Sequence, residues 1–171
     1  GIVKNALKLS VLLFQRPGEI RSMRWSEINW EKSRWERMSF RQKARRDHIT
    51  PLSTQVLAVL EEMQSFTGES EFVFPNIRNW TEPMSDNSVR VALRGMGFGK
   101  EAITPHGFRA MARTILEEEL GYSDKLVELQ IAHKVYNPMG RAYDRTAFLP
   151  ERSAMMQRWA DYLDQLAGDE K

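Results

Sequence analysis

Apolar residues recur at three- and four-residue steps in several segments of this chain, and Pro and Gly residues separate those segments. This spacing is that of one face of an α-helix. It predicts helices over residues 2–14, 17–25, 53–68, 85–96, 104–120, 124–132 and 151–166. Extended structure is predicted only for residues 28–29, 35–40 and 48–51, and residues 76–83 are expected to form a loop. The pattern therefore indicates a mainly α protein with a small antiparallel β-sheet, an α+β fold.

The predicted helices carry their own start signals and apolar faces. Ser53, Ser85 or Asp86, and Thr104 are suited to cap helix N-termini, and Pro17 and Pro105 suit a first turn. The apolar faces are predicted to form the core. For the first, third and last helices they consist of Val3, Leu7, Val11 and Phe14; Val56, Val59, Leu60 and Met63; and Met155, Trp159, Tyr162 and Leu166.

The composition is that of an ordinary globular chain, with 171 residues, 42% of them hydrophobic and 28% charged. This length suits one domain over residues 1–171 with a sizeable core. Apolar runs such as Val11 to Phe14 are far too short to span a membrane. The absence of Cys fits a reducing compartment. Because the chain opens on Gly rather than Met, we expect a piece of a longer polypeptide whose N-terminal part is missing.

The charges are unevenly distributed, although the net charge is only +2. Basic residues gather between Arg34 and Arg46, whereas acidic residues gather at Glu117 to Glu119 and in the C-terminal tail. This asymmetry predicts one basic face on an otherwise mixed surface. Taken alone, the basic cluster favours a solvated hairpin.

Two arginines have the chemistry needed to hold a phosphodiester. Arg16 precedes a Pro-Gly turn, and Arg109 lies three residues after His106, on the same face of a predicted helix. The planar guanidinium meets two phosphate oxygens at once and stays charged. A helix start also presents free N–H groups to an anion. The alternatives are a surface arginine at Arg16 and an exposed polar helix turn at His106 and Arg109.

Three further residues complete a set suited to strand cleavage. Lys43 lies at the tip of the basic hairpin and can donate a proton to a leaving oxygen. His133 follows an apolar helix end, and Tyr143 is a candidate nucleophile that needs cationic neighbours or a base. A packed histidine and a buried tyrosine are the ordinary alternatives. Tyr122, Tyr136 and Tyr162 compete with Tyr143, and Tyr162 fits the apolar face of the last helix.

Several cofactor signatures are missing from the sequence. It has no carboxylate cluster spaced for magnesium, no Cys/His zinc pattern and no Gly-rich phosphate loop. Phosphoryl chemistry in this chain is thus expected to run without metal or nucleotide.

The ordered set resembles the catalytic domain of the tyrosine recombinases, in particular the phage-type integrases of bacterial prophages and genomic islands. The matching motifs are Arg-Pro-Gly-Glu from Arg16, Lys-Ala-Arg-Arg-Asp-His-Ile-Thr-Pro from Lys43, His-Gly-Phe-Arg from His106, Ala-His at His133 and Ala-Tyr-Asp-Arg-Thr around Tyr143. They extend over nearly the whole chain. Ala132 stands where many members have Gly.

The resemblance implies a role for each residue of the set. Arg16 and Arg109 would bind the scissile phosphate, and His106 and His133 would hold its oxygens and assist proton transfer. Lys43, eight residues before the closing Pro51, would protonate the leaving 5′ oxygen. Tyr143 would form a 3′-phosphotyrosyl link. The basic residues expected to contact DNA are Arg41, Arg45, Arg46, Arg90 and Arg94.

The resemblance also implies the partners of the intact protein. These are double-stranded DNA, a homotetramer on paired sites that exchanges a C-terminal segment, and accessory DNA-bending or directionality proteins. It implies N-terminal DNA-binding domains that this chain lacks, and a bacterial cytoplasmic, nucleoid-associated location. Two other functions remain open: a type IB topoisomerase, which the motifs at Arg16 and Tyr143 disfavour, and a catalytically silent DNA-binding module.

Overall fold

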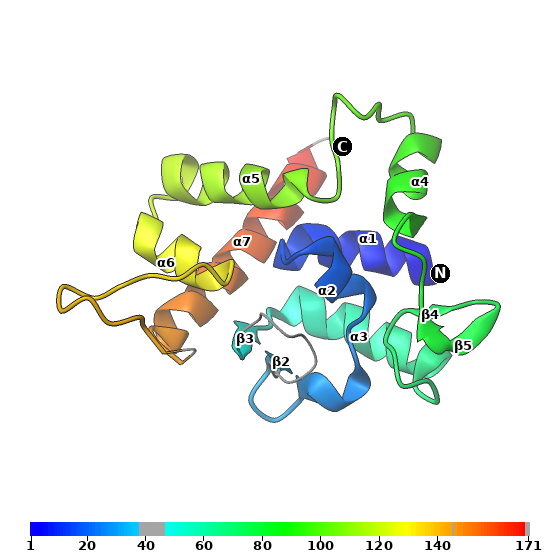
Figure 1. Ribbon diagram of the computed structural model, residues 1–171. Helices are drawn as coiled ribbons and strands as arrows, with labels where there is room; N and C mark the ends of the chain where they lie inside the picture. Colours follow the sequence, from blue (N-terminus) through cyan, green and yellow to red (C-terminus); the bar gives the residue numbers. More distant parts are fainter. Residues whose placement is uncertain (38–46, 145, 170–171) are drawn as a thin grey trace. The chain divides into compact units, whose positions relative to one another are not determined.

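The computed structural model describes residues 1–37, 47–144 and 146–169 (Figure 1). The chain divides into two compact units. Unit 1 contains Gly1–Ser26 and Val56–Ala112, and unit 2 contains Glu27–Gln55 and Arg113–Lys171. None of the described helices combines the length and apolarity needed to span a membrane.

Unit 1 is built from helices and one small β-hairpin. Its elements are α1 (Ile2–Leu13), α2 (Pro17–Arg21), most of α3 (Thr54–Thr67), β4 (Pro75–Asn76), β5 (Asn79–Pro83), α4 (Ser88–Gly95) and most of α5 (Gly107–Thr114). Helix α1 packs against both α2 and α4. Fully or almost fully buried residues of its core include Leu9, Leu13, Ile20, Met23, Leu60, Met63 and Phe74.

Helix α1 forms where the apolar period predicts it, but it buries a different face. Val3, Leu7 and Val11 are only half-buried, whereas Asn5, Ala6, Leu9, Ser10 and Leu13 are buried. Apolar residues surround most of this helix, so the period by itself does not select one side. Val3 instead lines a shallow hollow with Val91 and Ala92 of α4. Of the predicted stripe, Phe14 is buried, but it lies just beyond the helix.

Helix α3 matches its prediction closely. It begins at Thr54, directly after Ser53, and ends at Thr67, directly before Gly68. All four predicted core residues, Val56, Val59, Leu60 and Met63, are buried. A helix with one continuous apolar face and polar residues elsewhere is the case in which sequence period determines burial.

Residues 76–83 form a hairpin, so the predicted loop is wrong there. Strands β4 and β5 pair antiparallel with Asn76 opposite Asn79, which leaves Ile77 and Arg78 as the turn. The Asn76 side chain accepts a hydrogen bond from the Arg78 N–H at 2.9 Å. Residues 79–82 of β5 are exposed, so this strand has no buried face and shows none of the alternation that marks a strand in sequence.

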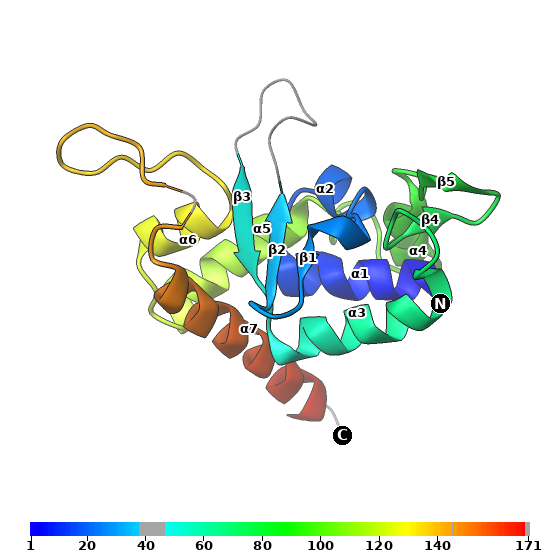
Figure 2. The same cartoon turned by 90° about the horizontal axis from the view of Figure 1, so that it is seen from below.

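Unit 2 contains the three-stranded sheet and the C-terminal helices. Its strands are β1 (Ile28–Asn29), β2 (Arg34–Arg37) and β3 (His48–Pro51), preceded by a 3₁₀ turn that spans Trp25–Glu27. The strands are antiparallel in the order β1-β2-β3, with Trp35 of β2 opposite both Ile28 and Thr50 (Figure 2). The helical segments are the π-helical turn Ile115–Glu119, α6 (Asp124–Gln130) and α7 (Leu149–Asp169). The predicted α+β class is confirmed.

Helix α7 packs against β3 and α6 and buries the core residues Met155, Met156 and Trp159. Tyr162 stacks on Trp159 with ring centres 6.2 Å apart, which confirms its place on the apolar face. The predicted last member of that face, Leu166, is 46% exposed because the helix runs beyond the core.

One buried cation joins three segments of unit 2. Arg152 is 1% exposed, and its guanidinium donates to Gln130 Oε1 at 3.0 Å, to the Ile49 carbonyl at 2.5 Å and to the Ala147 carbonyl at 3.5 Å. Burial lowers the pKa of Arg152 to about 10, so the group is still charged at neutral pH. Arg152 thereby fixes the start of α7 to β3 and to the end of α6.

Candidate active site

A residue in the left-handed (αL) conformation, here called a left-handed joint, turns the chain between α1 and Arg16. Phe14 closes α1 with φ 39° and ψ 33°, and its N–H still donates to the Ser10 carbonyl at 3.1 Å. A non-glycine residue rarely adopts this conformation, and here a completely buried aromatic ring accompanies it. The joint ends α1 and directs Arg16 to the start of α2.

Arg16 is positioned by the first turn of α2. Pro17 is the first helical residue, as predicted, and the N–H groups of Glu19 and Ile20 both donate to the Arg16 carbonyl. The buried Glu19 carboxylate accepts from the Arg16 N–H at 3.3 Å and lies 3.7 Å from its guanidinium. The side chain of Arg16 is 34% exposed. Glu19 therefore holds an arginine that solvent still reaches.

His106 and Arg109 lie at the start of α5. The Thr104 hydroxyl accepts from the Gly107 N–H at 3.0 Å, which confirms the predicted capping role of Thr104. Pro105 and His106 form the turn before the first residue of α5, Gly107, so the helix begins two residues later than predicted. The Arg109 N–H donates to the His106 carbonyl at 3.2 Å. His106 is exposed, whereas Arg109 is buried.

The Arg109 side chain contacts the joint that precedes Arg16. Its Nη1 donates to the Phe14 carbonyl at 3.2 Å, and the residue is only 6% exposed. The carbonyl groups at a helix end need partners outside the helix, and Arg109 supplies one here. Unit 1 therefore brings Arg16 and Arg109, 93 residues apart in sequence, to one place, with His106 one turn from Arg109. We call this group the arginine corner.

In unit 2, a helix-terminating motif positions His133. After α6 ends, Ala132 adopts φ 63°, and the N–H groups of Ala132 and His133 donate to the carbonyls of Leu129 and Glu128. These two bonds are those of a Schellman motif, in which Gly usually occupies the left-handed position. Ala132 adopts this left-handed backbone at some cost in strain.

The motif places the His133 ring against a carboxylate. His133 Nδ1 lies 2.5 Å from Glu128 Oε2, and the other oxygen of Glu128 lies 2.6 Å from Arg113 Nη1. Arg113 also pairs with Glu117 and Asp124, at 3.1 and 2.7 Å, and Glu128 is the leading cause of a raised pKa of Arg113. The sequence analysis missed this network. A Glu five residues before a histidine that follows a helix end is the signal that predicts it.

Tyr143 lies on a hairpin that starts just after His133. The Tyr143 N–H donates to the Val135 carbonyl at 2.9 Å, and Tyr136 pairs with Ala142. At the tip, the Asn137 side chain accepts from two backbone N–H groups, and Gly140 adopts φ 76°. The hairpin thus brings Tyr143 beside Val135, which lies two residues after His133. Tyr136, a rival nucleophile, is 58% exposed on the opposite strand.

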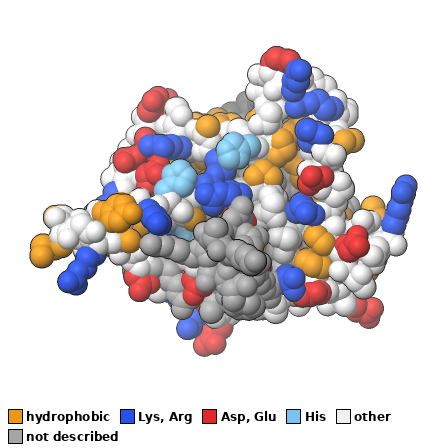
Figure 3. Space-filling view, in the orientation of Figure 1, with side chains coloured by type: hydrophobic (Ala, Val, Ile, Leu, Met, Phe, Trp, Pro, Cys, Tyr) orange, Lys and Arg blue, Asp and Glu red, His pale blue; other side chains and the backbone are white. Residues whose placement is uncertain are grey.

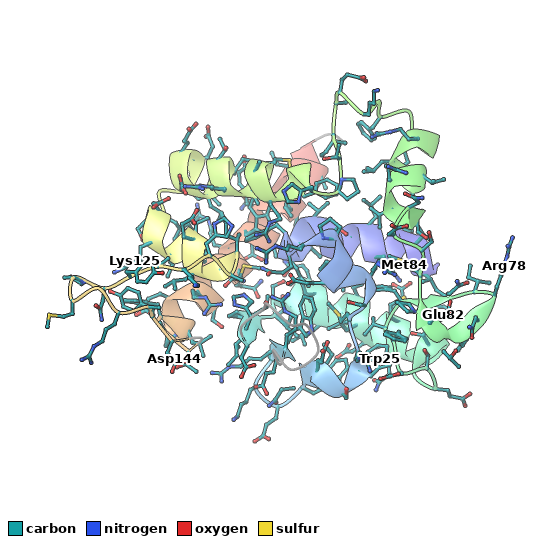
Figure 4. All side chains as sticks on the ribbon, in the orientation of Figure 1. Trp25, Arg78, Glu82, Met84, Lys125 and Asp144 are labelled. Atoms are coloured by element: carbon teal, nitrogen blue, oxygen red, sulfur yellow. The ribbon has the colours of Figure 1, made fainter. Side chains whose placement is uncertain are left out.

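The Tyr143 ring is half-buried between an aromatic ring and a cation. It packs edge-to-face on Phe148 with ring centres 5.4 Å apart. Lys125 Nζ lies 5.6 Å from the Tyr143 ring centre and 4.4 Å from that of Phe148, and Figure 4 labels this lysine on α6. Sequence reasoning missed Lys125 because nothing in its local pattern distinguishes it from other exposed lysines. It places a positive charge beside the Tyr143 ring.

The remaining predicted site residues divide into two groups. Lys43, Arg41, Arg45 and Arg46 lie outside the described residues. Arg90 and Arg94 lie on α4, where Lys and Arg side chains gather at the upper right of Figure 3. Arg94 donates to the carbonyls of Phe98 and Ile103 and so holds the loop after α4, whereas Arg90 is exposed beside Asn87.

Comparison with known proteins bears on this site. The model of the phage integrase family matches residues 3–148 of the chain. The chain belongs to the phage integrase family of tyrosine recombinases. The predicted resemblance is thereby confirmed. The chain is 41% identical to the integrase of Enterobacteria phage P4 over 95% of its own length, and 40% identical to the prophage integrase IntA of Escherichia coli over 88%. It spans only 40% and 36% of those two relatives.

Solved structures share the fold at lower identity. An integrase from mycobacterium phage Brujita matches 92% of the chain and 51% of its own, with a TM-score of 0.69 and 15% identity. The lambda integrase catalytic core matches 77% of the chain and 83% of its own, with a TM-score of 0.58 and 21% identity. These likenesses establish the catalytic-domain fold of tyrosine recombinases.

Proposed function

We propose that this chain is the catalytic part of a site-specific DNA recombinase, an integrase of a prophage or genomic island. It cleaves and rejoins DNA strands through a 3′-phosphotyrosyl intermediate. The observation that carries the proposal is the bond from the Arg109 guanidinium to the Phe14 carbonyl, two residues before Arg16. Two arginines far apart in sequence share one place on unit 1, as a bound phosphate requires.

The arginine corner is suited to a phosphate that gains charge during reaction. Attack on phosphorus adds negative charge to the non-bridging oxygens, and fixed donors stabilise that charge without reorganising. The contact with Phe14 restrains the Arg109 guanidinium. Glu19 limits the movement of Arg16. His106 adds a ring nitrogen to the same group.

The nucleophile is Tyr143. Its phenolic oxygen forms a bond to phosphorus, the bond from phosphorus to the 5′ oxygen breaks, and the 3′ phosphate remains attached to the tyrosine. The phenol gives its proton to His106, and Lys43 supplies one to the leaving 5′ oxygen. Lys125 adds positive charge beside the tyrosine ring. His133 holds a phosphate oxygen.

The transferred bond makes a nucleotide cofactor unnecessary. The phosphotyrosyl ester conserves the energy of the original phosphodiester, and attack by a new 5′ hydroxyl reverses the first step. We propose that no metal or ATP takes part. The substrate is double-stranded DNA, and Arg41, Arg45, Arg46 and Arg90 are the proposed backbone contacts, with Arg94 set back by its carbonyl partners.

The intact protein is proposed to carry DNA-binding domains N-terminal to this chain, because the chain spans about two-fifths of the curated relatives it matches. The two units together form one catalytic domain in this proposal. Full-length protein would act as a tetramer on paired sites, with DNA-bending or directionality proteins as partners, in the bacterial cytoplasm on the nucleoid.

Trapping of the covalent adduct tests the proposal. Nicked duplexes with randomised bases around the nick and a label at the 5′ end of the cleaved strand are incubated with the chain in EDTA. Release of the short fragment beyond the cleavage point prevents rejoining, so a labelled protein–DNA band accumulates. Tyr143→Phe should abolish the band and keep DNA binding, whereas the matched variant Tyr136→Phe should retain the band. A band that survives Tyr143→Phe and disappears with Tyr136→Phe would assign the nucleophile to Tyr136.

Two further measurements separate the alternatives. A type IB topoisomerase would relax a supercoiled plasmid that lacks any partner site, and a silent DNA-binding module would bind DNA without an adduct. Binding through phosphates makes the logarithm of affinity fall against the logarithm of salt concentration with a slope of about −0.9 for each phosphate contacted. A flat dependence would contradict the proposed backbone contacts.

A further inference from the structure

We propose that Glu128 is a positioning residue for His133 and that Arg113 holds Glu128 in place. This inference rests on the proposed function, in which His133 contacts the scissile phosphate. It assigns to Glu128 and Arg113 a part in the reaction that the motifs of the sequence analysis do not include.

The pairing follows from the local backbone. In a Schellman motif, the residue two positions after the helix end lies against the residue three positions before that end, and an apolar contact often joins the two. Here these residues are His133 and Glu128, and a hydrogen bond of 2.5 Å replaces the apolar contact. The same turn therefore bonds the two residues twice, through the backbone at 3.0 Å and through the side chains.

Glu128 is itself fixed on its other side. Its side chain is only 16% exposed, and Arg113 Nη1 lies 2.6 Å from Oε1. The same guanidinium reaches Glu117 through Nε and Asp124 through Nη2, so all three of its nitrogens face carboxylates. A guanidinium held at three points has little freedom to rotate. Arg113, which lies on α5, thus restrains the Glu128 carboxylate that bonds the His133 ring.

The contact also determines which ring nitrogen is turned toward the carboxylate. A carboxylate only accepts hydrogen bonds, so a neutral His133 ring carries its proton on Nδ1, beside Glu128. Nε2 then is the nitrogen that points away from Glu128. In the protonated ring both nitrogens donate, and Nε2 can bond a phosphate oxygen. Without Glu128, the ring can rotate and exchange the two nitrogens.

The rate of adduct formation in a single turnover tests the role in the reaction. Glu128→Met removes the acceptor and should slow the step about 10- to 100-fold, the range seen when a hydrogen-bonding partner of a metal-binding histidine is lost. Glu128→Gln keeps an acceptor oxygen and should recover most of that loss. Glu118→Met, at an exposed position of the π-helical turn, is the matched control and should leave the rate unchanged.

The tautomer of His133 gives a readout that a purely structural role would not change. The chain has three histidines, so a His133→Gln sample identifies the His133 signals in a long-range ¹H–¹⁵N spectrum. After the pH is raised until the shifts stop changing, the unaltered chain should show the proton on Nδ1. Glu128→Met should move it toward Nε2, and Glu128→Gln should keep it on Nδ1.

The outcomes separate this inference from the proposed function. If the unaltered chain forms no adduct with any nicked duplex, the proposed function fails, and the tautomer measurement alone still tests the Glu128 contact. If it forms the adduct and Glu128→Met matches Glu118→Met in rate and tautomer, the positioning role is overturned. A loss of rate with an unchanged tautomer would overturn it as well.

Discussion

The arginine corner and the hairpin that carries Tyr143 are held by different means. In the corner, Arg109 is buried and bonds a backbone carbonyl, and Arg16 stands on a helix start. The hairpin has an exposed tip, and side chains of α6 contact its tyrosine and the histidine before it. A backbone carbonyl thus anchors Arg109, one of the proposed phosphate-binding groups, whereas the proposed nucleophile depends on side-chain contacts that single substitutions can remove.

Both regions use a left-handed joint at a residue other than glycine. Phe14 and Ala132 have φ values of 39° and 63°. The ring of Phe14 is completely buried, so its strain is offset by burial of an aromatic side chain. Ala132 contributes only a methyl group. The joint in unit 1 therefore cannot be relaxed without loss of core, whereas the joint in unit 2 can.

The largest effect is expected from Arg109→Lys. Lysine keeps the charge but lacks the planar fork, so adduct formation should fall about 10²- to 10³-fold, as for the loss of one fixed donor to a developing oxyanion. Single-turnover trapping with the nicked duplex measures the rate. Arg78→Lys, at the exposed turn labelled in Figure 4, is the control in the same unit and should react normally. A loss below about threefold for Arg109→Lys would contradict the view that the arginine corner holds Arg109 as a fixed donor.

The next largest effect is expected from loss of the buried Arg152 guanidinium in unit 2. Arg152→Met leaves the buried acceptors at Gln130 and Ile49 without their guanidinium partner, and each such loss costs about 1–3 kcal/mol. We expect the free energy of unfolding to fall by about 2–4 kcal/mol in urea titrations. The exposed Arg158→Met should stay within about 0.5 kcal/mol. Equal stability of the two variants would show that Arg152 does not join these segments.

Gly140→Ala tests how strongly the hairpin tip holds the backbone of Tyr143 in place. A Cβ there meets no atom within 4 Å, so only the backbone at φ 76° resists it, at a cost of about 1 kcal/mol. The Tyr143 N–H should then exchange with solvent about fivefold faster, because its bond to Val135 opens more often. Gly95→Ala, with no atom near its Cβ and no positive φ, should leave that exchange rate alone.

The smallest effect, and the only stabilising one, is expected from Ala132→Gly. Glycine adopts the left-handed position without steric cost, which should raise stability by up to about 1 kcal/mol. This corresponds to about 2–4 °C in Tm for a chain of this size. Calorimetry measures the shift, and adduct formation should be unchanged because the bonds of Glu128 to His133 remain. A lower Tm would argue that the Ala132 methyl group packs usefully.

The sequence predicts those parts of the fold that one-sided apolar periods and cap residues specify. Helix α3, the Thr104 cap and strands β1 and β3 follow directly from such signals. The buried face of α1 does not, because a helix that is apolar on most sides is oriented by its neighbours. The hairpin β4–β5 lacks a buried face and so leaves no periodic signal.

The candidate site divides in the same way. Residue types suited to a phosphate identify Arg16, His106, Arg109 and Tyr143 in the linear chain. The carbonyl that orients Arg109 and the lysine beside Tyr143 arise from tertiary packing, which local spacing does not encode. Glu128 is an intermediate case: its contact is local, but recognising it requires knowing that α6 ends in a left-handed turn at Ala132.

In the proposed reaction, the Phe14 carbonyl makes strand cleavage depend on a completed fold. The ring of Phe14 must enter the core before its carbonyl can face α5, and only then does Arg109 gain the partner that orients it. A chain still emerging from the ribosome, or one in the course of unfolding, lacks this contact. Under the proposed function, incompletely folded copies would therefore not cleave DNA.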